Sequence, residues 1–74
     1  MTSTQDAIRA VYAQVHAPAW ASPNLDGLLD VLRDLSWLPE GEVVLDRPAD
    51  SQVVAVVRQA EADTADGPRP VRLA

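Results

Sequence analysis

Apolar side chains recur at helical spacing near the start of the chain and predict a first helix over residues 4–15. The positions at i, i+3, i+4 and i+7 are Ile8, Val11, Tyr12 and Val15. This stripe is typical of an amphipathic helix with one buried face. Ser3 followed by Asp6 resembles a capping box with Asp in place of Glu, which indicates where the helix begins.

Two prolines interrupt the pattern, and a second helix follows them. Pro18 and Pro23 each disfavour helical backbone at the preceding residue, so residues 16–23 are expected to form a loop. Asn24 is a good N-cap at the end of this loop. The second helix is expected to run to about residue 35, because helical spacing relates five leucines: Leu25, Leu28, Leu29, Leu32 and Leu35.

Two short segments predict strands. The turn signal at residues 39–41 precedes the run 42–46, which is rich in valine and is closed by Pro48, so we expect a short buried strand there. Residues 64–70 contain a glycine and two prolines and are expected to be irregular. The tail 70–74 fits a final short strand.

The segment between these strands fits two kinds of structure. Residues 53–57 match both a helix and a strand, but the helical pattern continues to Ala62, so a third helix capped by Asp50 or Ser51 is favoured. A strand, a helix and a strand together predict a right-handed parallel crossover. We therefore expect an α/β fold, with three main helices packed on a short two-stranded parallel sheet, in a single domain spanning residues 1–74.

Composition narrows the classes of function. The 74 residues include 11 acidic and 6 basic side chains, which give a net charge of -5. This charge repels nucleic acids and anionic lipid but attracts a basic partner. No stretch is long and apolar enough to span a bilayer, and the first residues lack the pattern of a secretion signal, so we expect a cytoplasmic protein.

Little in the chain supports catalysis. With 0 cysteines and a single histidine, His16, neither a common zinc site nor a catalytic triad can be assembled. His16 is instead expected at the C-terminal end of the first helix. The 3 glycines form no phosphate-binding loop. We expect a binding protein without metal or cofactor rather than an enzyme.

Three carboxylates share one face of the second helix. Asp26, Asp30 and Asp34 follow one another at i, i+4 spacing, opposite the leucines, and like charges so placed repel. They are either a solvated face that Arg33 partly relieves or a surface that a partner uses.

Trp20 precedes these acids in the loop. A large aromatic residue beside carboxylates is typical of a protein-binding hot spot. Because the chain has only three aromatic residues, Trp20 could also be needed in the core. Of the two tryptophans, Trp37 is the one expected in the core, since it lies between the apolar positions Leu35 and Leu38.

Residues 17–32, Ala-Pro-Ala-Trp-Ala-Ser-Pro-Asn-Leu-Asp-Gly-Leu-Leu-Asp-Val-Leu, resemble the signature of the barstar family. That signature is Ala or Leu, Pro, an aromatic residue, usually Gly, and then Asn-Leu-Asp-Ala-Leu-Trp-Asp. The resemblance extends to residues 43–45, 57–60 and the final strand. It implies an intracellular inhibitor that blocks the active site of a small basic ribonuclease, or of a related toxin, for self-protection.

The resemblance also implies roles for particular residues. Asp30 would enter the phosphate-binding pocket of the ribonuclease, and Asp26 would meet a second basic group there. Trp20 would pack over the catalytic groups of the enzyme. Asn24 would order the junction between loop and helix.

The chain departs from the family pattern at several positions of the implied binding surface. Ser22 stands where a glycine is usual, Leu29 replaces a tryptophan, and Arg33 occupies a position that is usually small and polar. Gln59 replaces an acid of the last helix. The first strand of the family has no counterpart in the sequence, so we expect an exposed sheet edge that promotes self-association.

Two alternatives stay open at this point. Asp50-Ser51 at the start of a helix, in a small acidic chain, is compatible with an acyl-carrier-like protein modified at Ser51. A barstar-like interaction domain without inhibitory activity is the other.

Overall fold

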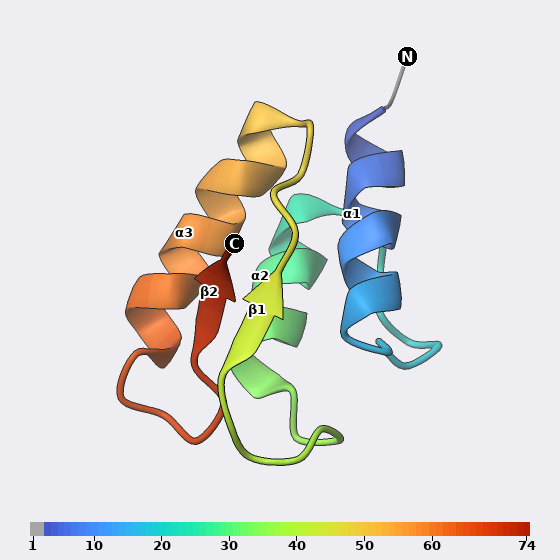
Figure 1. Ribbon diagram of the computed structural model, residues 1–74. Coiled ribbons are helices and arrows are strands. Elements are labelled where there is room, and N and C mark those ends of the chain that lie inside the picture. Colours follow the sequence, from blue (N-terminus) through green and yellow to red (C-terminus); the bar gives the residue numbers. More distant parts are fainter. Residues whose placement is uncertain (1–2) are drawn as a thin grey trace.

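The computed structural model describes residues 3–74 and contains three helices and two strands (Figure 1). In chain order these are α1 (Thr4–Gln14), α2 (Leu25–Asp34), β1 (Val43–Leu45), α3 (Ser51–Thr64) and β2 (Val71–Leu73). The predicted α/β class, with three helices and a short parallel sheet, is confirmed. Residues 53–57 lie within α3, so the helical interpretation of that ambiguous segment is also correct.

The two strands form a parallel pair, with Val43 opposite Val71 and Leu45 opposite Leu73. Helix α3 makes the crossover between them. Both strands run in one direction and all three helices run in the other, with α1 on the β1 side of the sheet and α3 on the β2 side (Figure 1). This places α2 and α3 against each other, where their apolar faces meet.

The predicted capping box of α1 is present. The Asp6 backbone N–H donates to the Ser3 hydroxyl oxygen at 3.0 Å, and the Asp6 carboxylate accepts from the Ser3 N–H at 3.5 Å. At the other end His16 follows the helix with a left-handed backbone, φ 53°. The Ala17 N–H then donates to the Tyr12 carbonyl at 2.9 Å, which closes the last turn as in a Schellman motif.

The core is built from the apolar faces that the sequence predicts. The predicted stripe of α1 is buried throughout, as are three of the five leucines of the second helix. Leu25 and Leu29 are only partly buried, whereas Val31, which the leucine spacing omitted, is fully buried. The largest fully buried side chains are Ile8, Val11, Val15, Leu28, Val31, Leu32, Leu35, Leu45, Val53 and Val57.

The prediction of a buried strand over residues 42–46 is wrong in one respect. Strand β1 spans only Val43–Leu45, and within it Leu45 is buried while Val44 is 49% exposed. Successive side chains of a strand point to opposite faces, and the helices leave one face of this sheet open, so alternate residues meet solvent. Self-association through the sheet edge stays a prediction.

Asp50 joins α3 to α1. Its carboxylate accepts hydrogen bonds from the Gln52 and Val53 N–H groups at 2.8 and 3.1 Å, so Asp50 rather than Ser51 is the N-cap. The Thr4 hydroxyl also donates to it at 2.7 Å. The bond from Thr4, followed by those from the backbone, lowers the pKa of Asp50, because each of them favours the ionised carboxylate.

This pKa shift predicts part of the acid sensitivity of the fold. A carboxyl with a lowered folded pKa stabilises the protein above its unfolded pKa and loses this effect as pH falls through the folded pKa. We expect Asp50→Asn to retain the helix cap and to flatten the loss of stability as pH falls below about 4, the ordinary pKa of an aspartate. Urea midpoints of both proteins across this range measure the difference, and parallel pH profiles would contradict the prediction.

The left-handed residue at the end of α1 predicts a stabilising substitution. Such a backbone costs a residue with a Cβ about 1–2 kcal/mol, and glycine avoids this cost at some loss of chain entropy. We expect His16→Gly to raise the free energy of unfolding by up to about 1 kcal/mol. In the matched control, Ala13→Gly inside α1, we expect the free energy of unfolding to fall by about 1 kcal/mol. Urea denaturation compares the two, and a loss in both variants would show that His16 is unstrained.

Candidate functional site

The acidic residues of α2 face solvent. The Asn24 side chain accepts the Gly27 N–H at 2.6 Å, which fixes the predicted start of the helix, and burial of the leucine face turns the opposite face outward. Asp26, Asp30 and Asp34 are exposed, and within residues 3–74 no side-chain hydrogen bond or ion pair involves them. Their charges are therefore available to a partner.

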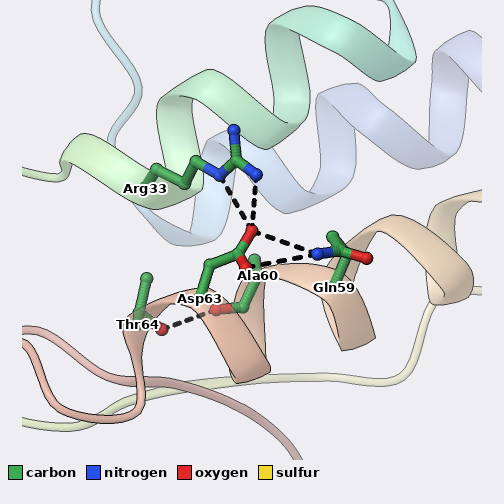
Figure 2. Close-up of polar contacts among 5 residues, drawn as sticks. All are labelled: Arg33, Gln59, Ala60, Asp63 and Thr64. Atoms are coloured by element: carbon green, nitrogen blue, oxygen red, sulfur yellow. Dashed lines mark hydrogen bonds and ion pairs between the residues drawn. The ribbon is translucent and has the colours of Figure 1, made fainter.

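Arg33 does not relieve these three acids, because it pairs with α3. Its Nε and Nη2 atoms donate to Asp63 at 2.9 and 2.6 Å (Figure 2). The Gln59 amide donates to both oxygens of the same carboxylate, at 3.2 and 3.3 Å. The hydrogen bond from Arg33, and then that from Gln59, lowers the pKa of Asp63. Arg33 and Gln59 thus both bond to the Asp63 carboxylate, which the sequence did not identify as part of the site.

Trp20 lies outside the core. It is 64% exposed, which excludes a core role and leaves its ring available to a partner. It meets Trp37 edge to face, with ring centroids 6.1 Å apart and an interplanar angle of 89°. Trp37 packs against the core as expected, and its indole N–H donates to the Val15 carbonyl at 2.9 Å.

Tyr12 connects the loop between α1 and α2, which carries Trp20 and is called the tryptophan loop below, to the face of α2 that carries the three aspartates. Its hydroxyl donates to the Ser22 backbone carbonyl at 2.6 Å. Burial raises the pKa of Tyr12, and the nearby negative charge of Asp30 raises it further. Asp30 thus lies close enough for its charge to act on the Tyr12 hydroxyl, whereas Arg33 pairs with Asp63 of α3.

Asp26 borders an open cleft at the shared N-terminal end of α1 and α2. The cleft has a volume of about 640 Å³ and combines backbone and polar groups with apolar side chains. Its lining residues are Thr4, Gln5, Ile8, Pro23, Asn24, Leu25 and Asp26. A side chain of a bound protein could enter here and meet a carboxylate.

The residues proposed from the sequence fall into two groups. Trp20, Ser22, Asn24, Asp26 and Asp30 belong to the loop and the first turns of α2. Ser22 contributes its backbone carbonyl, which accepts the Tyr12 hydroxyl.

Arg33 and Gln59 form the second group, further along α2 and on α3. The sequence did not identify Tyr12 or Asp63 as parts of these groups. A buried tyrosine hydroxyl needs a partner, which was a usable signal for Tyr12. No local pattern links Asp63 to Arg33, which lies 30 positions earlier.

The geometry suits binding by charge and aromatic contact. Within residues 3–74 no group of three or more histidine, aspartate or glutamate side chains could hold a metal ion. No helix in this part of the chain has the length and hydropathy of a bilayer span. Ser51 is the first residue of α3 and follows a strand, so the fold differs from the four-helix bundle of an acyl carrier.

Comparison with known proteins identifies the family. The family model described as Barstar (barnase inhibitor) matches residues 1–73 of the chain. No curated protein matched the chain, and no solved structure matched it. Since the family match covers nearly every residue, including the loop and the acidic helix, the chain belongs to the Barstar family of barnase inhibitors.

Proposed function

We propose that this protein binds a basic ribonuclease of the barnase type and blocks its active site, as a means of self-protection. One observation carries the proposal: Asp26 and Asp30 are exposed carboxylates on one face of a helix, without an ion-pair partner within residues 3–74, and they follow a loop that projects Trp20 into solvent. Family membership supports it.

The chemistry of carboxylates explains how such a surface would act. A ribonuclease binds the phosphates of its substrate with cationic side chains, and a carboxylate accepts the same charge-assisted hydrogen bonds. Asp30 would take the place of a phosphate, and Asp26 would pair with a second cation. Because a helix holds both groups in place before binding, little conformational entropy is lost. The net charge of -5 would draw a basic protein toward this face.

The remaining site residues would support this contact. Trp20 would cover the catalytic groups of the ribonuclease and exclude water from them. Asn24 fixes the start of α2 through its bond to Gly27. Arg33 and Gln59 would border the interface on the α3 side, where Arg33 offsets the charge of Asp63.

A second candidate function is binding without inhibition. It is favoured by the lack of net charge on the α3 side of the surface, where Arg33 pairs with Asp63. Gln59 carries no charge, and its amide is already engaged with Asp63. If the partner protein is bound through α2 alone, its catalytic groups could stay open to RNA. Titration of ribonuclease activity distinguishes the two functions, because an inhibitor abolishes RNA cleavage at one equivalent and a simple interaction domain does not.

Loss of the Asp30 carboxylate tests the proposal directly. We expect Asp30→Ala to weaken binding to a barnase-type ribonuclease by at least about 30-fold, and Asp26→Ala by about 10-fold, because each leaves a cation in the enzyme unpaired. The matched control is Asp66→Ala, which removes the same charge from an exposed position after α3. Isothermal titration calorimetry measures all three, and equal affinities for Asp30→Ala and Asp66→Ala would refute the proposed site.

Arg33 allows a test of electrostatic steering. Arg33→Ala releases the Asp63 carboxylate and makes the surface more acidic by one charge. We expect association with the basic ribonuclease to become about two- to fivefold faster at low salt, with the difference shrinking above about 0.15 M salt as charges are screened. Stopped-flow fluorescence measures the association rate. Slower association would show instead that Arg33 itself contacts the partner favourably.

A further inference from the structure

The backbone carbonyl of Ser22 is the point at which three parts of the structure meet. It accepts the Tyr12 hydroxyl of α1 at 2.6 Å and the Asn24 N–H at 2.9 Å. A Cβ built at Gly27 of α2 would lie only 2.6 Å from the same oxygen, so no other residue type fits there without a shift. The Ser22 carbonyl oxygen is therefore the atom at which helix α1, the tryptophan loop and α2 come into contact.

Tyr12 is suited to hold this carbonyl. Its ring belongs to the buried stripe of α1 and is only 9% exposed, so its position is set by the core. The Ser22 bond is the one hydrogen bond described for its hydroxyl in residues 3–74. A phenol is protonated at neutral pH and can donate, and burial, followed by the charge of Asp30, raises the pKa of Tyr12 further above its ordinary value.

Trp20 depends on these contacts of the Ser22 carbonyl because it has little packing of its own. Its ring is largely exposed and rests edge-on against Trp37. The loop around it is held further by a bond from the Ala21 N–H to the Pro18 carbonyl at 3.0 Å and by partial packing of Ala17 and Ala21 against the core. Without a fixed Ser22, the segment between the end of α1 and Asn24 could vary, and the direction of the indole with it.

We propose that Tyr12 and Gly27 are positioning residues, which fix the Ser22 carbonyl and thereby hold Trp20 in one orientation before the partner arrives. The choice of a ribonuclease as partner rests on the proposed function. The lock on the Ser22 carbonyl is itself a property of the free protein. Its advantage is that the loop loses its conformational entropy when the protein folds, so this cost does not reduce the affinity for the partner.

Two substitutions open the lock by different means. Tyr12→Phe removes only the hydroxyl, and Gly27→Ala pushes the Ser22 oxygen away. Amide hydrogen exchange in the free protein reports loop order, and we expect the Ala21 and Asn24 amides to exchange about three- to tenfold faster in both variants. The control is Thr64→Val, which removes a buried hydroxyl that donates to the Ala60 carbonyl at 2.7 Å and accepts the Val71 N–H at 2.9 Å, so it lowers stability outside the loop.

Binding kinetics provide the second measurement. We expect Tyr12→Phe and Gly27→Ala to weaken ribonuclease binding about three- to tenfold, chiefly through faster dissociation, while Thr64→Val binds as the parent does. Unchanged exchange at Ala21 in Tyr12→Phe would overturn the lock. Faster exchange with unchanged affinity would overturn its role in recognition.

These two measurements keep the proposal separate from the proposed function. If the parent protein binds no barnase-type ribonuclease, the proposed partner is rejected, and the exchange rates of the free protein still accept or reject the lock. If Asp30→Ala abolishes binding but Tyr12→Phe changes neither measurement, the proposed function stands and the lock is rejected.

Discussion

Burial of one face of α2 is the constraint on which the rest of the structure depends. Leu28, Val31 and Leu32 are at most 1% exposed and pack the helix against α3 and the remaining core. A helix of ten residues has only two broad faces, so placing this one inside fixes the other outside. The direction of Asp26 and Asp30 is therefore decided by hydrophobic packing, although their own repulsion opposes the arrangement.

The distribution of charge follows from this packing. Contact between α2 and α3 brings Arg33 to Asp63, and this pair, with Gln59, neutralises the seam between the helices (Figure 2). Asp26 and Asp30, nearer the tryptophan loop, form no ion pair within residues 3–74. Arg33 is thus engaged within the molecule, whereas Asp26 and Asp30, nearer the start of α2, present negative charge to a partner. An exposed ion pair contributes little to stability, so its main effect here is to decide which carboxylates stay free.

The fold could be predicted almost completely from local signals. Ser3 with Asp6, Asn24 and Asp50 mark helix starts because a short polar side chain satisfies free backbone N–H groups wherever a helix begins. The helical spacing of apolar residues predicted the buried faces of α1 and α2. The strand over residues 42–46 was less accurate, because sequence pattern does not reveal whether one or both faces of a sheet are covered.

The candidate site was determined by the sequence only in part. The sequence by itself determined that Asp26, Asp30 and Asp34 share a helical face and that an aromatic loop precedes them, because residue spacing and proline act over a few positions. Only the tertiary structure decided that Trp20 is exposed, that Arg33 is engaged with Asp63, and that Tyr12 holds Ser22. These contacts join residues from separate elements, and which elements meet depends on how the whole core packs.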